Sequence, residues 1–189
     1  MDQLPLDLQR EILLRLPYKQ VRALCQSPDY QRVCQGMLQH RAREKYGVSR
    51  EEFETLHPEM SEVERFEFFR GGDLWKRGKT SEPNLLGRAV RRRHSGMIAY
   101  YLWDKPLPIY AFRAMVGEKD WNSMCFVSQY ARVKGTITVR LAARAVMEGA
   151  PLECLERLYV VPWEEVIVEI GDNDDAVGRV LEYLGSAYA

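Results

Sequence analysis

Histidine and aspartate are among the residue types in this sequence that could hold a metal ion. The three histidines are isolated, and no pair has the His-x-x-x-His spacing of a metal site: His40, His57 and His94. The acidic run at 172–175 lacks the turn glycine and the Glu at the twelfth position that a calcium loop needs. We therefore interpret this run as a helix cap and expect no metal site.

Nucleophilic and phosphate-binding patterns are also missing from the sequence. Gly71-Gly72 lacks the Gly-Lys-Ser/Thr ending of a phosphate-binding loop, and no Gly-x-Ser-x-Gly elbow occurs. The four cysteines form no Cys-x-x-Cys pair and lie in apolar stretches: Cys25, Cys34, Cys125 and Cys154. This pattern predicts buried, reduced thiols in an intracellular protein. We expect no enzymatic activity and no cofactor.

A run of positive charge is the most distinctive chemical feature. Arg91, Arg92 and Arg93 follow Arg88 closely and cover a whole helical turn, so not all of these side chains can be buried. Three interpretations fit this basic patch. It contacts phosphate or acts as a nuclear import signal, it is a solvated helix end, or it pairs with the acidic C-terminal segment, either within the chain or between copies of it, since the sequence leaves the oligomeric state open.

Charge is unevenly distributed, although the formal net charge of the 189 residues is zero. Residues 44–69 carry eight acidic and three basic residues, residues 70–147 carry five acidic and fifteen basic, and residues 148–189 carry ten acidic and two basic. The first residues do not resemble a signal peptide, and no apolar stretch approaches the ~20 residues of a membrane span. We expect a soluble protein that does not enter membranes.

Three short helices are predicted in about the first forty residues. Pro5 can occupy a first helical turn and Pro17 ends the same helix. The apolar residues of this helix share one face: Leu8, Ile12, Leu13 and Leu16. A second apolar stripe lies at 21–25, and Ser27-Pro28-Asp29 is typical of a third helix start.

A helical connector and a loop are predicted at 48–83. Capping boxes at 49–52 and 61–64 place a serine three residues before a glutamate, which predicts two helix starts. We expect the second helix to end at Gly71-Gly72 and a loop to follow from Asp73 to Pro83.

Pairs of helical segments repeat through 84–189 at a spacing of about 24–30 residues, as in solenoid proteins. The predicted pairs are 85–93 with 97–103, 110–116 with 121–133, 139–147 with 152–159, and 163–170 with 176–183. Clusters of Val, Ile and Thr at 135–139 and 166–170 show no long alternation, so they too are predicted to be helical.

The segment 1–47 resembles an F-box. Leu4-Pro5, Ile12-Leu13, the stripe at 21–25 and Val33-Cys34 are similar to that family's start, its first two helices and its end. Together with Tyr46-Gly47, these residues resemble in particular the F-box-like proteins of large DNA viruses of the marseillevirus and mimivirus groups. Such modules often precede ankyrin repeats there. The family usually has a Trp shortly after the closing Cys, where this chain reads Gln-Gly-Met-Leu.

The resemblance implies docking on the Skp adaptor of a host cullin–RING ubiquitin ligase. The resemblance implies that the adaptor would be contacted by Leu4, Pro5, Leu8, Ile12, Leu13, Leu16, Val21 and Leu24. Three short helices cannot bury all their apolar surface alone, so some of it faces another protein or the rest of the chain. Both alternatives remain open at the level of sequence.

The repeat region resembles degenerate ankyrin units. Leu85–Val90 and Leu141–Val146 are similar to an ankyrin first helix, while the Thr-Pro-Leu-His box is missing. The expected fold is all-α, with an F-box-like module at 1–47 and stacked, ankyrin-like helical hairpins at 84–189. Stacked hairpins form an extended face that suits protein binding.

Two functions are consistent with these features. The first is a non-enzymatic adaptor that engages the host Skp subunit and holds a target, as yet unspecified, on its repeats. The alternative is a viral protein that acts on the host nucleus or nucleic acid through the basic zone 70–147, with the F-box-like part only structural. For either function, the resemblance implies that the protein is located in the host cytoplasm or nucleus.

Overall fold

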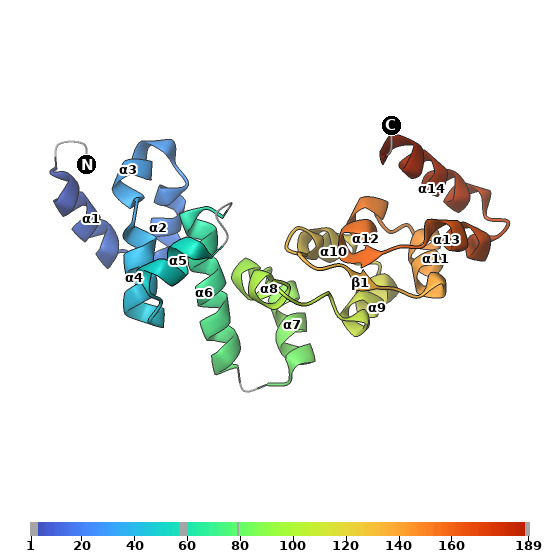
Figure 1. The fold of residues 1–189 in the computed structure, drawn as a ribbon, viewed down its shortest axis with the longest axis horizontal. Coiled ribbons are helices and arrows are strands. Elements are labelled where there is room, and N and C mark those ends of the chain that lie inside the picture. Colours follow the sequence, from blue (N-terminus) through green and yellow to red (C-terminus); the bar gives the residue numbers. More distant parts are fainter. Residues whose placement is uncertain (1–3, 57–59, 79, 188–189) are drawn as a thin grey trace. The chain divides into compact units, whose positions relative to one another are not determined.

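Helices make up most of the chain in the part that the computed structural model describes, residues 4–56, 60–78 and 80–187 (Figure 1). Within these ranges, strand is limited to one parallel pair of two-residue strands. The predicted all-α class is therefore confirmed. The chain divides into two units, Met1–Arg77 and Gly78–Ala189.

Prolines set the start of the first helices. The first unit begins with α1 (Leu6–Arg15), α2 (Tyr18–Cys25), a 3-10 turn (Pro28–Tyr30) and α3 (Gln31–Cys34). Pro5 and Pro17 directly precede α1 and α2, where the missing N–H of proline costs no helical hydrogen bond. The predicted end of the first helix before Pro17 is confirmed. The third predicted helix is shorter than expected, because Pro28 begins a 3-10 turn and the α3 that follows ends at Cys34.

Capping boxes begin two of the next helices, as predicted. These helices are α4 (Met37–Tyr46), α5 (Arg50–Thr55) and α6 (Glu62–Arg77). Ser49 Oγ accepts from the N–H of Glu52 at 3.1 Å, and Glu52 Oε2 accepts from the N–H of Ser49 at 2.7 Å. Ser61 and Glu64 exchange the same two bonds, at 3.3 and 2.8 Å.

The prediction that Gly71 and Gly72 end their helix is wrong, because α6 continues to Arg77. The loop predicted at 73–83 is wrong for residues 73–77, which belong to α6, and for Glu82 and Pro83, which begin the next helix. Both glycines are buried, and α6 packs along α4. Tertiary packing thus outweighs the helix propensity of glycine, which is about 1 kcal/mol worse than that of alanine. An ion pair of 2.9 Å from Arg77 Nε to Asp73 Oδ1 lies across the last turn.

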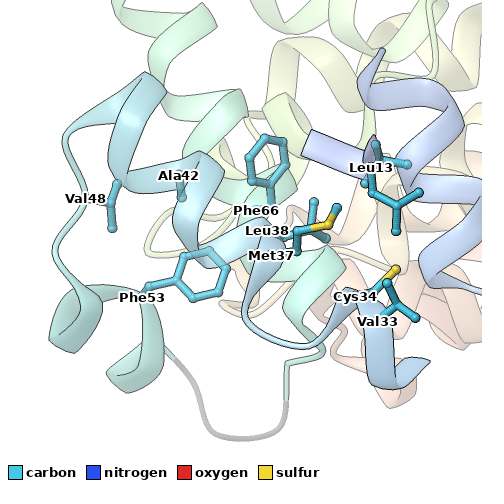
Figure 2. Packing of buried hydrophobic residues seen from close by; sticks show 10 residues of the cluster. Leu13, Val33, Cys34, Met37, Leu38, Ala42, Val48, Phe53 and Phe66 are labelled. Atoms are coloured by element: carbon cyan, nitrogen blue, oxygen red, sulfur yellow. The ribbon is translucent and has the colours of Figure 1, made fainter. Parts of the chain in front are cut away.

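The core of the first unit is one cluster of apolar side chains from its helices and from Val48, which lies between α4 and α5 (Figure 2). Its members are Leu13, Val21, Val33, Cys34, Met37, Leu38, Ala42, Val48, Phe53 and Phe66. The buried Arg41 donates through Nη2 to the carbonyl oxygens of Leu14 and Leu16, at 2.6 and 2.5 Å. The end of α1, whose last carbonyls have no partner inside the helix, is thereby satisfied.

Cys25 and Cys34 form a disulfide. The prediction that all four cysteines are reduced thiols is wrong for this pair. The sequence offered no pairing motif, because contact between these residues depends on how α2 packs against α3 after the turn at Pro28. Cys125 and Cys154 are free.

Four helix pairs build the second unit. They are α7 (Glu82–Arg91) with α8 (Ser95–Tyr101), α9 (Ile109–Glu118) with α10 (Trp121–Ser128), α11 (Val139–Met147) with α12 (Leu152–Leu158), and α13 (Trp163–Ile170) with α14 (Asp174–Ala187). Each helical segment predicted here is present, with displaced ends. Neighbouring pairs touch through α7 and α9, α10 and α12, and α11 and α13.

The predicted helix at 135–139 is partly wrong, because Gly135–Thr136 is the strand β1. It pairs in parallel with β2 (Tyr159–Val160). A Cβ at Gly135 would lie 3.0 Å from the ring of Tyr159, so this close approach requires a glycine. The strand also explains why α10 ends at Ser128 and not at residue 133: the chain has to leave the helix to reach β2.

Candidate protein-docking site

Helix α1 is anchored to the first unit along one side. It packs against α3 and α4. Arg10 Nε donates to the carbonyl oxygen of Val33 at 3.3 Å, and Leu13 is fully buried. With the Arg41 bonds at its C-terminal end, this side of α1 has a fixed position in the unit.

Apolar side chains remain exposed on α1 and just before it. Leu4, Leu8 and Ile12 are 39%, 48% and 40% exposed, and we call these three residues the α1 row. Their spacing of four places neighbouring members on the same face of a helix. Gln9 Nε2 donates to the carbonyl oxygen of Leu4 at 2.6 Å, which ties the residue before the helix to the helix itself. The first unit thus presents an ordered apolar row to its surroundings.

The eight residues predicted to bind a partner fall into three groups by burial. They are the exposed Leu4, Pro5, Leu8 and Ile12, the partly buried Leu16 and Leu24, and the fully buried Leu13 and Val21. The last two leave no side-chain surface for a partner, so they stabilise the unit itself. Periodicity alone could not separate these groups, because it identifies an apolar stripe without saying what covers it.

The four arginines of the basic patch have different surroundings, although all are exposed. Arg88 Nη2 donates to Thr80 Oγ1 at 2.6 Å. Arg93 has a left-handed backbone, with φ of 47°, and its guanidinium lies 5.4 Å from the centre of the Phe126 ring. Arg91 and Arg92 form no ion pair with any residue that the structure describes. Only these two are therefore clear candidates for an external anion.

The histidines that the structure describes contact neighbouring residues on their own helices. His94 Nδ1 accepts from the N–H of Met97 at 3.3 Å and caps α8. The exposed His40 lies 3.3 Å from Glu44 on the next turn of α4. His57 lies outside the described residues. The run at 172–175 begins α14, and its cap is the asparagine: Asn173 Oδ1 accepts from the N–H of Ala176 at 3.1 Å. Within the described ranges no group of three His, Cys, Asp or Glu residues is arranged to hold a metal.

Two surface hollows have both charged and apolar residues in their lining. The hollow in the first unit, about 430 Å³, is lined by Cys25, Arg32, Cys34, Gln35, Leu38, Ser61, Glu62 and Val63. The hollow in the second unit, about 310 Å³, is lined by Ile109, Arg113, Thr136, Ile137, Thr138 and Leu141. Neither hollow could be predicted from the sequence, because each is built from segments that are distant along the chain.

The residues that anchor α1 were also missed at the level of sequence. Arg41 lies in a polar stretch of α4, where a charged side chain is normally expected to face solvent. A spacing of 25 to 27 residues from its carbonyl partners is not a local motif. Only packing of α4 against α1 brings these groups together.

No helix in the described part of the chain is long and apolar enough to cross a membrane. Comparison of the chain with family models, with curated proteins and with solved structures finds no match.

Proposed function

We propose that this chain is a non-enzymatic adaptor of the F-box-like type found in large DNA viruses. Its first unit docks a Skp-type subunit of the host ubiquitin machinery through the α1 row. The observation that supports this is the exposure of Leu4, Leu8 and Ile12 beside an anchored helix. An exposed apolar row on a positioned element is typical of a protein interaction site.

Energetics indicate how large the docking interface must be. Full burial of a Leu or Ile side chain contributes about 1.5–3 kcal/mol, and the α1 row is already partly buried. A micromolar complex requires about 8 kcal/mol beyond the cost of association. The row is therefore the centre of a larger interface, whose rim includes the exposed ion pair of Glu11 with Arg15 at 2.6 Å.

The second unit holds the target of the adaptor in this proposal. Its helix pairs are consistent with a stacked, ankyrin-like arrangement, which offers side chains along one extended face. The hollow beside β1 places Arg113 at an apolar wall that includes Ile109 and Leu141. This chemistry suits a segment with an apolar side chain next to a carboxylate. Ubiquitin-linked function places the protein in the host cytoplasm or nucleus.

A binding measurement with a purified Skp-type subunit tests the docking proposal. We expect the wild-type chain to bind at micromolar concentration in titration calorimetry. Leu8→Asp with Ile12→Asp should weaken binding about 100-fold, because each charge replaces an apolar contact at the centre of the interface. Helical circular dichroism should be unchanged, since both side chains are exposed.

Two matched variants separate docking from folding. Val168→Asp with Leu181→Asp changes apolar residues of the second unit that are more exposed than Leu8 and Ile12, and should leave binding intact. Leu13→Asp places a charge in the core and should unfold the first unit. Absence of binding by the wild-type chain contradicts the proposal. Unfolding of the Leu8/Ile12 variant would show that these residues pack within the chain.

A second candidate function rests on Arg91 and Arg92. Both are exposed and form no ion pair with described residues, so they are available to phosphate groups. In this alternative the protein acts on host nucleic acid through its basic zone, and the first unit is only structural. The salt dependence of DNA affinity distinguishes this function from the adaptor function.

A further inference from the structure

The two free cysteines face each other across neighbouring helix pairs. Cys125 lies on α10 and Cys154 on α12, and these two helices pack together. The thiol of Cys154 donates to Sγ of Cys125 at a sulfur–sulfur distance of 2.7 Å. Non-bonded sulfur atoms rarely approach so closely. Formation of a covalent bond between them therefore needs little movement of either helix.

The two cysteines differ in their exposure to solvent. Cys125 is half-buried and Cys154 is buried. A disulfide reagent in solution therefore meets the sulfur of Cys125 first, and Cys154 is already in position to resolve the product. A more accessible attacking thiol with a second thiol behind it is the arrangement that converts a mixed disulfide into an internal one.

We propose that Cys125 and Cys154 are an oxidation site that forms an internal disulfide with a low-molecular-weight disulfide such as oxidised glutathione. The Cys125 thiolate attacks one glutathione sulfur and releases the other as glutathione thiolate. The Cys154 thiolate then attacks Cys125 Sγ, breaks the mixed disulfide and releases the second glutathione thiolate. Two cysteine thiols are oxidised, one glutathione disulfide is reduced, and the two protons pass to the released glutathione.

The surroundings make this oxidation slow at neutral pH. Burial is the main cause that raises the pKa of Cys125, to about 12. The thiolate is the attacking species, so its fraction rises about tenfold per pH unit below that pKa. The product cross-links α10 to α12, across a sequence separation of 29. Closing that loop stabilises the second unit by restricting its unfolded state.

Peptide mapping of the full-length chain tests the proposal. The protein is equilibrated with reduced or oxidised glutathione, alkylated, and digested with trypsin without reduction. The four cysteines fall on four different tryptic peptides: 120–132, 145–157, 23–32 and 33–41. We expect oxidised glutathione to link 120–132 to 145–157, faster at pH 9 than at pH 7. The melting temperature should rise by on the order of 10 °C.

Two variants check the order of events. Cys154→Ala should retain glutathione on Cys125, and Cys25→Ser with Cys34→Ser should still form the 120–132 to 145–157 link. Wild-type mapping decides even where a variant fails to fold. Three outcomes would each overturn the proposal. Cys125 and Cys154 could both remain open to alkylation after oxidation, or wild-type Cys125 could keep its glutathione adduct. The peptides 120–132 or 145–157 could also link to the peptides of Cys25 or Cys34.

Discussion

The carboxylate of Glu67 is buried in the first unit and surrounded by hydrogen-bond donors. It accepts from the Tyr18 hydroxyl at 2.7 Å and lies 3.2 Å from Arg22 and from Arg70. Burial, together with this carboxylate, raises the pKa of the Tyr18 hydroxyl above its ordinary value, so it remains a donor. The cluster joins α2 to α6, and a buried charge with such partners stabilises the junction of the two helices.

Glu67→Gln should lower the free energy of unfolding of the first unit by about 1–2 kcal/mol. The substitution removes the charge that both arginines face. The loss stays below that of a fully buried pair because Arg22 and Arg70 are partly exposed to solvent. Urea unfolding followed by circular dichroism measures it. Glu54→Gln, which alters an exposed pair with Arg50, is the control and should leave the midpoint unchanged.

Single residues of the α1 stripe have different roles despite a shared pattern. Ile12 and Leu13 are adjacent, yet Ile12 is 40% exposed and Leu13 is fully buried. A helix turns by about 100° per residue, so neighbours of equal hydropathy can lie on either side of the packing boundary. The docking proposal depends on this boundary and not on the stripe as a whole.

Helix α6 supplies the N-terminal cap of another helix. Glu62 Oε1 accepts from the N–H groups of Leu38 and Gln39, at 2.8 and 3.1 Å, and Oε2 accepts from Gly36 at 3.1 Å. Gly36 precedes α4 and has no side chain that could cap it. The carboxylate therefore satisfies free N–H groups and faces the positive end of the α4 dipole.

Loss of this cap should be measurable. We expect Glu62→Ala to destabilise the first unit by about 1–2 kcal/mol, because three N–H groups at the start of α4 lose their acceptor. Glu51→Ala is the matched variant, since it removes an acid from the first turn of α5 without a tertiary bond. Thermal melts of both variants make the comparison. Equal shifts would mean that Glu62 acts only within its own helix.

Charge is partly neutralised inside the second unit. Lys119 Nζ lies 2.6 Å from Glu148, and Arg140 Nε lies 3.5 Å from Glu169, so basic and acidic zones meet there. Neither contact uses the basic patch. Internal pairing with the acidic segment is thus carried by other residues, and the phosphate-binding and solvated interpretations of Arg91 and Arg92 remain to be separated.

Salt dependence of DNA affinity separates them. If Arg91 and Arg92 contact phosphates, Arg91→Gln with Arg92→Gln should flatten the plot of log affinity against log salt by about two units. Fluorescence anisotropy with a duplex oligonucleotide at several salt concentrations gives the slope. Arg32→Gln with Arg43→Gln, exposed in the first unit, is the control. If neither pair of substitutions alters the slope, the nucleic-acid function is contradicted.

Local chemistry by itself determined where most helices lie. Pro17, the two capping boxes and the break at Gly171 act through backbone geometry and neighbouring side chains, which the sequence contains in full. The same information predicted the helix pairs of the second unit in their order, because apolar residues at helical spacing recur between turn residues.

Tertiary structure decided which of these local preferences prevailed and which side chains meet. Burial carries α6 through Gly71 and Gly72, and the approach of Tyr159 to Gly135 turns a predicted helix into a strand. Exposure of Ile12 beside buried Leu13 depends on α3 and α4 covering one side of α1. Contacts between residues distant in sequence contribute energies as large as local propensities, and only the folded chain brings them together.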